Sequence, residues 1–272
     1  MDCIILERFK NILSIRLGIK ISYLNDDEWD SLLQERLTLN NCKDPSEYLD
    51  ITLKTDEEIQ AVIEHVVNTE TWFYREKVAF SAIIKKIPVL SRPLEILDLA
   101  CSSGEEPFSV LMEVAQQGLS LSSVEIDAVD VSMRALQRAK DGVYEKYSFR
   151  GHDFGYVEQY FDKVDHGLYA IREVLKNRVS FFQGNVVESD FTPPRDKYDV
   201  ILCRNLLMYL HSDALEQVFT LFREHLREDG ILIVSSSEGE ITRRNGFESY
   251  FVEGFQVYYD TKAATERKPV LG

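Results

Sequence analysis

The stretch LEILDLACSSGEEP, residues 94–107, joins a short apolar run to a turn of small residues and an acidic segment. Its first half, 94–100, has the length and the continuous apolar character of a buried strand. Ser102 and Gly104 in the following turn would let a ligand approach the backbone closely. Pro107 is suited to the first turn of a helix. The stretch therefore predicts a strand, a ligand-accessible turn and a helix, which together begin a βαβ unit.

Alternation of this kind continues to the end of the chain. It predicts an α/β fold, a doubly wound and mostly parallel sheet with helices on both faces. The final pattern, YFVEGFQVYYD at 250–260, contains no helix and favours an antiparallel edge hairpin. The other strand candidates are SVEIDAVD (123–130), VSFFQG (179–184), YDVILCRN (198–205) and GILIVSS (230–236), and the helical stretches include 132–141 and 212–226.

Residues 1–90 carry helical patterns and no strand pattern. Thr55 with Glu58 predicts a capping box at the start of one of these helices, because the two side chains can bond each other's backbone N–H groups. We therefore expect an N-terminal helical domain with a linker over residues 1–90 and a second domain over residues 91–272.

Residues 143–178 interrupt the alternation. The segment is rich in aromatic and charged residues, and it is far longer than the usual βα loop of about 2–6 residues. We interpret it as a small insertion subdomain within the second domain. We expect it to contact another protein and not to build the ligand pocket.

The composition excludes several classes of protein. A net charge of −15 over 272 residues argues against general nucleic-acid binding, which needs a basic face. No apolar run approaches the roughly 20 residues that span a bilayer, so we expect a protein that is not membrane-inserted. The four cysteines form no CxxC pair, which favours a reducing cytoplasm and argues against a zinc site. We interpret Cys101 and Cys203 as buried small side chains.

Asp130 ends the second predicted strand, beside the turn that follows the first. An acid there can accept hydrogen bonds from both ribose hydroxyls of a nucleoside; alternatively, Asp130 or Ser132 caps the next helix. The turn contains no GxGxxG, and Glu105 and Glu106 would repel a pyrophosphate, so a dinucleotide is disfavoured. A nucleoside with a positive centre fits better, and S-adenosylmethionine is such a ligand.

Four segments together resemble the chemotaxis-receptor methyltransferase family (CheR type), over residues 5–259. Two short forms, ETWFYR and YSFRG (147–151), are similar to the branch found in Wsp-type surface-sensing systems, where tetratricopeptide repeats often follow the catalytic part. Because this chain ends at RKPVLG, it is either a fragment or a shorter relative. The four segments are TETWFYRE (69–76), ACSSGEEPFSV (100–110), DVSMRALQRAKDGVY (130–144) and YDVILCRNLLMYL (198–210).

The resemblance implies a Class I methyltransferase sheet, an all-helical N-terminal domain and a small β insertion. It implies methyl-ester formation on glutamate side chains of a chemoreceptor, with S-adenosylhomocysteine as the product and no metal. Arg75 and Tyr209 would lie near the transferred methyl group. The implied cofactor-binding residues are Thr69, Thr71, Arg75, Glu105, Asp130, Asn185, Val186, Asn205 and Leu206.

Individual roles follow from the same resemblance. Glu105 would lie near the amino group of the cofactor, the pair at 185–186 beside the adenine, and the backbone at 205–206 beside the methionyl part. Thr69 stands where the family often has Asn. Its hydroxyl has a shorter reach, which puts a cofactor contact by Thr69 in doubt.

The expected reaction needs few catalytic groups. A glutamate carboxylate is ionised at neutral pH, because its unperturbed pKa is about 4.3, so no general base is required. Arg75 could hold one carboxylate oxygen while the other attacks the methyl group. The aromatic neighbours 72–74 would fix this arginine and exclude water.

The expected partner is a chemoreceptor-like signalling protein, which is the substrate of a monomeric enzyme. Two other functions stay open: a Class I methyltransferase acting on another acid or protein, and a non-enzymatic S-adenosylmethionine sensor. Residues 1–67 contain 7 Lys and Arg against 14 Asp and Glu, so this part is not an expected docking surface for an acidic receptor helix.

Overall fold

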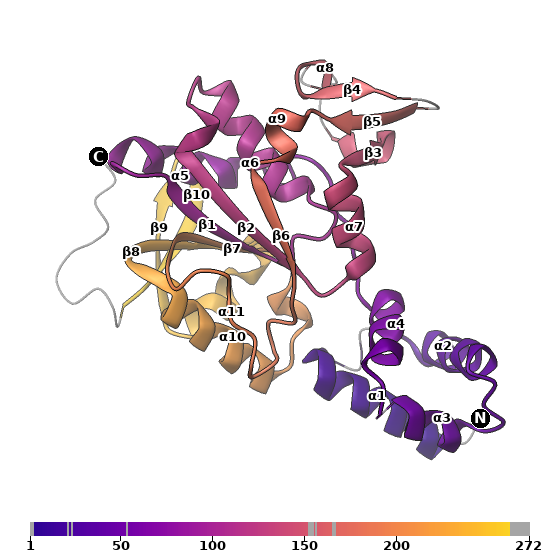
Figure 1. The fold of residues 1–272 in the computed structure, drawn as a ribbon. Coiled ribbons are helices and arrows are strands. Elements are labelled where there is room, and N and C mark those ends of the chain that lie inside the picture. Colours follow the sequence, from indigo (N-terminus) through magenta and orange to yellow (C-terminus); the bar gives the residue numbers. More distant parts are fainter. Residues whose placement is uncertain are drawn as a thin grey trace.

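The computed structural model describes residues 3–20, 22, 24–52, 54–151, 155, 157–164 and 167–261. Its centre is a seven-stranded sheet with the order β6-β2-β1-β7-β8-β10-β9 (Figure 1). Strands from β6 through β8 run parallel, whereas β10 is antiparallel to β8 and β9. The strands are β1 (Leu94–Leu99), β2 (Val124–Asp130), β6 (Val179–Gln183), β7 (Tyr198–Cys203), β8 (Leu226–Ile233), β9 (Phe247–Val252) and β10 (Phe255–Asp260).

The predicted α/β fold with a mostly parallel sheet is confirmed, and so is the edge hairpin β9–β10. Strand β8 begins earlier than expected, at Leu226, and its register against β7 is irregular between Tyr198 and Val200. The chain order reverses at the centre of the sheet, because β2 and β6 lie on one side of β1 and β7 lies on the other. Such a reversal opens a crevice at the carboxyl ends of the strands, where ligands bind.

Helices cover both faces of the sheet, and strand side chains alternate between two apolar cores. On one face, Ile96 and Val200 belong to the core that α5 and α6 share. On the other, Leu97 and Ile201 belong to the core of α10. The helices around the sheet are α5 (Val78–Lys86), α6 (Glu105–Gln116), α7 (Met133–Asp141), α10 (Ser212–His225) and α11 (Gly239–Arg244).

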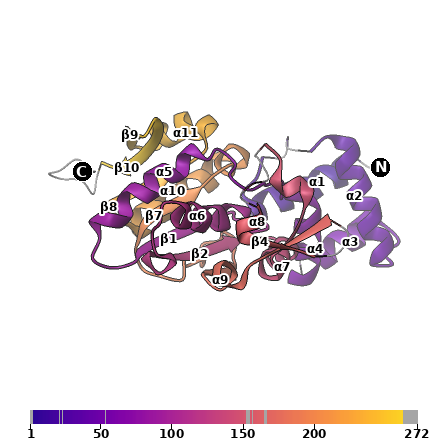
Figure 2. The same ribbon diagram turned by 90° about the horizontal axis from the view of Figure 1, so that it is seen from above.

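The first four helices form an apolar core of their own at one end of the molecule (Figures 1 and 2). Phe9 and Trp29 pack edge to face in this core, with ring centroids 6.0 Å apart. Helix α5 also precedes residue 90, but its residues Phe80 and Ile83 pack in the core of the sheet. The four helices are α1 (Cys3–Leu17), α2 (Asp26–Leu39), α3 (Pro45–Thr52) and α4 (Asp56–Val66).

The capping box predicted from Thr55 and Glu58 is wrong. Thr55 is the N-cap of α4, but its side chain makes no capping hydrogen bond. Glu58 instead turns into the helical core, where its carboxylate accepts hydrogen bonds from Arg36 at 2.7 and 2.6 Å and from Tyr48 at 2.8 Å. Glu58 therefore belongs to a buried ion pair and not to the helix cap that the local pattern predicted.

The predicted small β insertion is confirmed as a three-stranded antiparallel sheet of order β3-β5-β4. In Figure 1 it lies beyond α7, on the opposite side from α10 and α11. Its aromatic side chains reach back to the body of the protein: Phe149 and Phe161 each lie 5.0 Å from Phe73 between ring centroids. Its elements are β3 (Val143–Glu145), α8 (Val157–Tyr160), β4 (Phe161–Lys163), β5 (Leu168–Ile171) and α9 (Glu173–Lys176).

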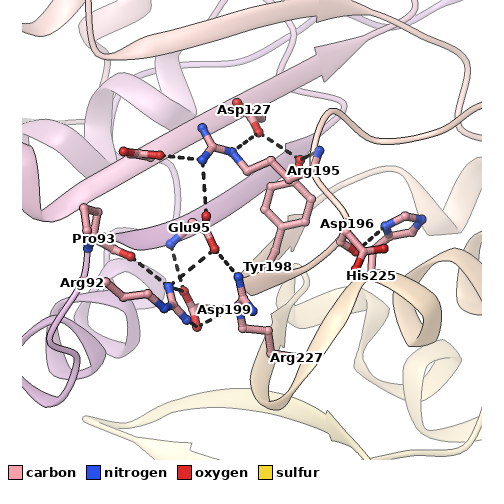
Figure 3. Close-up of polar contacts among 11 residues, drawn as sticks. Arg92, Pro93, Glu95, Asp127, Arg195, Asp196, Tyr198, Asp199, His225 and Arg227 are labelled. Carbon is pink, nitrogen blue, oxygen red and sulfur yellow. Dashed lines mark hydrogen bonds and ion pairs between the residues drawn. The ribbon is translucent and has the colours of Figure 1, made fainter.

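A cluster of arginines and carboxylates gathers near the amino ends of the central strands (Figure 3). Asp199 accepts two hydrogen bonds from Arg92, both at 2.7 Å. Asp127 accepts one from Arg195 at 2.7 Å and one from the Tyr198 hydroxyl at 2.9 Å. These contacts tie β1, β2 and β7 together at the edge opposite the ligand crevice.

In the described part of the chain, the helices are too short or too polar to cross a membrane.

Candidate functional site

The main cavity lies at the carboxyl ends of β1, β2 and β7, where the chain order reverses. It joins the turn after β1, the end of β2, the segment after β7 and the stretch that leads from α4 to α5. Seven of the predicted site residues line it: Thr69, Thr71, Arg75, Asp130, Asn205, Leu206 and Tyr209. Ile19 also lines it, so the segment after α1 covers this end of the sheet.

Asp130 fastens the turn after β1. Its carboxylate accepts hydrogen bonds from the backbone N–H of Ser102 at 2.7 Å and of Ser132 at 2.9 Å. Ser102 has a φ of +50°, and Gly104 has a φ of +86° with a tight approach to Ala139. Burial raises the pKa of Asp130, and these backbone hydrogen bonds oppose the shift. The turn thereby keeps a left-handed shape that brings its backbone to the edge of the cavity.

Of the two candidates for the cap of α7, Ser132 occupies the N-cap position. Its hydroxyl accepts a hydrogen bond from the backbone N–H of Ala135 at 3.0 Å. Asp130 does not make that bond and lines the cavity instead. Each carboxylate oxygen can accept more than one hydrogen bond, so Asp130 retains the capacity to bind a pair of hydroxyls.

Arg75 sits on a strained turn. The residues on either side, Tyr74 and Glu76, have φ values of +57° and +50°, which cost of order 1–3 kcal/mol each for residues other than glycine. Neighbouring contacts hold this turn: Ser109 accepts a hydrogen bond from the backbone N–H of Tyr74 at 2.8 Å, and the carbonyl of Ser148 accepts one from Phe73 at 2.8 Å. The guanidinium of Arg75 is therefore presented to the cavity by a rigid backbone.

The Arg75 side chain has few partners of its own. It lies over the indole of Trp72, with the guanidinium carbon 4.4 Å from the ring centroid. It donates one hydrogen bond to the carbonyl of Glu70 at 3.1 Å. Among the residues that the structure describes, no carboxylate forms an ion pair with it. The guanidinium at the cavity thus interacts with Glu106 through space but makes no ion pair with it, so its donors can reach a ligand.

Arg204 was not singled out from the sequence, yet it organises the site. Its side chain is 1% exposed and donates to Glu106 at 2.6 Å and to the carbonyl of Arg75 at 2.6 Å. It also forms an ion pair with Glu76 at 3.2 Å. Burial raises the pKa of Glu106, and the positive charges of Arg204 and Arg75 oppose the shift. Arg204 therefore holds the backbone of the Arg75 turn against the start of α6.

The two acids at the start of α6 face different ways. Glu106 lines the main cavity, whereas the predicted Glu105 does not. Glu105 is 1% exposed and accepts hydrogen bonds from the hydroxyls of Ser103 at 2.6 Å and Ser148 at 3.0 Å. It borders a second cavity, on the insertion side of the Val66–Thr71 segment. Glu105 thus shares a cavity with Thr69 and Thr71, which line both cavities, but not with Asp130 or Arg75.

The segment after β7 is held by another acid that sequence reasoning missed. Glu238 is buried, and its carboxylate accepts hydrogen bonds from the backbone N–H groups of Asn205 at 2.9 Å and Met208 at 3.3 Å. Asn205 has a φ of +59°, which this contact stabilises. The carbonyl of Tyr209 in turn accepts a hydrogen bond from the backbone of Lys20 at 2.8 Å. The segment is therefore fixed from both sides.

Asn185 and Val186 line an adjoining cavity that shares Asp130 and Leu206 with the main one. The side chain of Asn185 donates to the carbonyl of Arg16 at 2.9 Å. Its amide nitrogen therefore bonds the end of α1, while Asn185 and Val186 both border the cavity. The apolar lining of this cavity suits a flat ring more than a charged group.

The insertion supports the site without lining the main cavity. The hydroxyl of Tyr144 donates to the carbonyl of Ser103 at 2.8 Å, and Ser148 reaches Glu105. Both contacts brace the turn after β1 from behind. As expected, no described residue of 143–178 lines this cavity, although the first residues of the insertion hold part of its wall in place.

Two further predictions concern the cysteines and a metal site. Cys101 and Cys203 are buried, as expected, and burial raises the pKa of each thiol well above its usual range. Within the described ranges, no group of His, Cys, Asp and Glu side chains is arranged to hold a metal ion.

Comparison with known proteins gives one family and a set of relatives. Residues 69–253 match the model of the family described as CheR methyltransferase, SAM binding domain. The chain is 33% identical over 248 residues to the probable biofilm formation methyltransferase WspC of Pseudomonas aeruginosa, covering 89% of this chain and 58% of that protein. It is 27% identical over 247 residues to the chemotaxis protein methyltransferase of Borreliella burgdorferi, covering 86% and 87%.

A third relative, the chemotaxis protein methyltransferase of Escherichia coli, is 26% identical over 237 residues and covers 85% of this chain and 82% of that protein. A second WspC, from Pseudomonas putida, is 31% identical. The chain spans 58% of the length of each of the two WspC proteins.

Proposed function

Because the chain belongs to the CheR methyltransferase family, we propose that it transfers a methyl group from S-adenosylmethionine to glutamate carboxylates of a chemoreceptor-like signalling protein. The observation that carries this proposal is the placement of Arg75. Its guanidinium borders the cavity on a rigid turn and has no carboxylate partner among the described residues. A substrate carboxylate could form the direct ion pair that Arg75 lacks.

The cavity has features that suit the cofactor. A buried acid at the end of β2, Asp130, is the type of residue that accepts hydrogen bonds from ribose hydroxyls. The left-handed conformations of Ala100 and Ser102 place the turn after β1 at the edge of the cavity, which both residues line. The apolar cavity at Val186 would take the adenine, and Glu106 beside Arg204 would border the methionyl end.

S-adenosylmethionine would supply a methyl group on a positively charged sulfur, and S-adenosylhomocysteine would be the product. Arg75 would bind one oxygen of the incoming carboxylate and leave the other directed at the methyl carbon. The carboxylate is already ionised at neutral pH, so no side chain has to remove a proton. Tyr209, across the same cavity, would fix the reacting end, and the Trp72 ring would exclude water from Arg75.

The proposal places the protein in the cytoplasm, where receptor signalling domains lie. Incubating it with labelled S-adenosylmethionine and membranes from its own cell tests the function. Label on a receptor-sized protein is the expected result. Turnover on other acids with inert receptor would point to a different methyltransferase, and binding of S-adenosylhomocysteine with no turnover at all would point to a sensor.

A further inference from the structure

Two arginines share one indole ring at the edge of the cavity. The guanidinium carbon of Arg75 lies 4.4 Å from the ring centroid of Trp72, and that of Arg150 lies 4.2 Å from it. Arg150 also lies 3.8 Å from the ring centroid of Tyr147. These four residues form a ladder of alternating cations and aromatic rings, which we call the arginine ladder. It runs from the cavity to the insertion, whose residues Tyr147 and Arg150 form its outer half.

The outer half of the ladder already binds a carboxylate. Glu70 accepts a hydrogen bond from Arg150 at 2.8 Å and one from the hydroxyl of Tyr147 at 3.2 Å. The side chain of Glu70 is 53% exposed, and Tyr147 is 63% exposed. Arg150 itself is 24% exposed, so a carboxylate on another molecule reaches the same donors by displacing Glu70. Glu70 therefore marks where such a group would sit.

The backbone fixes Arg150 relative to Arg75. Arg150 donates to the carbonyls of Tyr147 at 3.0 Å and Thr71 at 3.4 Å, and Arg75 donates to the carbonyl of Glu70. Both guanidiniums are thus tied to the same short segment as well as to the same ring. Stacking on an aromatic face restricts a guanidinium without neutralising it. Arg75 makes no ion pair with a described residue, and the carboxylate paired with Arg150 is the exposed Glu70, which a substrate carboxylate would displace.

We propose that Arg150 binds a second carboxylate of the substrate polypeptide while Arg75 orients the target glutamate, so that the protein prefers glutamates flanked by another acidic side chain. This inference rests on the proposed function and names its substrate class, an acidic polypeptide segment. It also gives the insertion a role in choosing the substrate. The acidic N-terminal helices need not contact the substrate for this selection to operate.

A double-mutant cycle tests the proposal. The substrate is a purified cytoplasmic fragment of a chemoreceptor-like protein with one mapped target glutamate. A second form carries Gln in place of the acids within one helical turn of that glutamate. With Arg150→Ala, kcat/KM should fall about tenfold on the acidic form, through a higher KM. On the Gln form it should change less than about twofold, because that form has no acidic side chain for Arg150 to bind.

Three controls make the outcome decisive. Arg172→Ala removes another arginine of the insertion and should affect both forms alike. Arg150→Lys keeps the charge without the planar fork and should show a smaller coupling than the Ala variant. Calorimetry with S-adenosylhomocysteine should give unchanged affinity for every variant, which confirms that the cavity is intact.

The possible failures are distinguishable. If the wild-type protein methylates neither form, the proposed function falls and takes this inference with it. If it methylates both forms and Arg150→Ala lowers the rate on both by the same factor, the proposed function stands, and Arg150 only supports Trp72.

Discussion

Arg75 and Arg204 lie within one hydrogen-bonded unit but have different surroundings. Arg204 is buried between two carboxylates and donates to the backbone of Arg75, whereas the Arg75 guanidinium faces the cavity with no ion-pair partner in the described ranges. A buried cation paired with carboxylates stabilises a local structure, and a cation at a cavity that makes no ion pair is available to a ligand. Arg204 therefore positions Arg75.

The first prediction separates chemistry from binding at Arg75. Arg75→Ala should lower the single-turnover rate of methyl transfer far more than it weakens cofactor binding. The cofactor carries a positive sulfur, so a nearby arginine does not attract it in the ground state. Arg75→Lys should restore little of the rate, because a point charge lacks the planar fork. Calorimetry beside rapid-quench kinetics measures both effects, and a wild-type transfer rate in the Ala variant would refute the role.

The second prediction concerns Asp130. Asp130→Ala should weaken binding of S-adenosylhomocysteine by roughly 10- to 150-fold, since hydrogen bonds to a charged group contribute about 1.5–3 kcal/mol. Ser132→Ala is the matched control: it removes the cap of α7, which costs about 1 kcal/mol of stability, and should leave the affinity nearly unchanged. Equal losses of affinity in the two variants would mean that Asp130 only supports the helix.

Sequence patterns located some site residues and missed others for a physical reason. Asp130 ends a buried strand beside a turn of small residues, and that placement alone predicts a ligand contact. Arg204 and Glu238 act through residues distant in the chain, so no local pattern identifies their partners. A signal for Arg204 was present, because an arginine that directly follows the apolar run of β7 has to find a partner when it is buried.

At the level of helices and strands, tertiary contacts decided the cases that local patterns could not. The periodic runs of β1, β2, β6 and β7 were long enough to predict their strands. Thr55 and Glu58 had the spacing of a capping box, but the buried Arg36 needed a counter-ion more than the helix needed a second cap bond. A sequence pattern four residues long carries no information about such a distant partner.

This buried pair gives the third prediction. Glu58→Gln should destabilise the protein by about 3–5 kcal/mol, because it leaves Arg36 buried without a counter-ion. Asp56 lies on the same helix as Glu58 and forms an exposed ion pair with Arg16. Asp56→Asn should therefore have little effect on urea unfolding. If the two variants unfold at the same urea concentration, the buried pair contributes no more than the exposed one.

The same pair should also show in the pH dependence. Burial alone would raise the pKa of Glu58, but hydrogen bonds from Arg36, Tyr48 and Asn40 outweigh it and lower the pKa below its ordinary value of 4.5. A group with a lowered pKa in the folded state adds stability above its unfolded pKa and loses it as the pH falls through the folded value. The wild-type protein should therefore lose this stabilisation below pH 4.5, and the Gln variant should not.

The fourth prediction concerns the support that the insertion gives to the turn after β1. Tyr144→Phe leaves the carbonyl of Ser103 without its buried hydrogen bond, which costs about 1–3 kcal/mol. Part of that cost should appear as a severalfold loss of affinity for S-adenosylhomocysteine in calorimetry. Tyr160→Phe removes a hydroxyl of the same insertion that bonds Met112 instead, and it should leave the affinity unchanged. Equal affinities in the two variants would contradict this support.

For the whole molecule, the sequence pattern predicts the doubly wound sheet, but it does not predict where the N-terminal helices and the insertion lie against that sheet. Alternating strands and helices predict a doubly wound sheet and hence a site at the carboxyl ends of the strands. The sequence gives no sign that the end of α1 reaches this site. In the structure, Ile19 pairs with Leu210, and the backbone of His211 donates to Gly18 at 2.9 Å. The N-terminal helices are thereby joined to the segment that carries Tyr209.

The central claim is that this chain forms methyl esters on glutamate carboxylates. The most direct test is the chemistry of the product. A purified receptor fragment is labelled with methyl-labelled S-adenosylmethionine and the protein, and is then exposed to mild alkali. The account predicts that the label leaves as volatile methanol and that changing the target glutamate to Gln abolishes labelling. Label that survives alkali, or that persists on the Gln fragment, would contradict it.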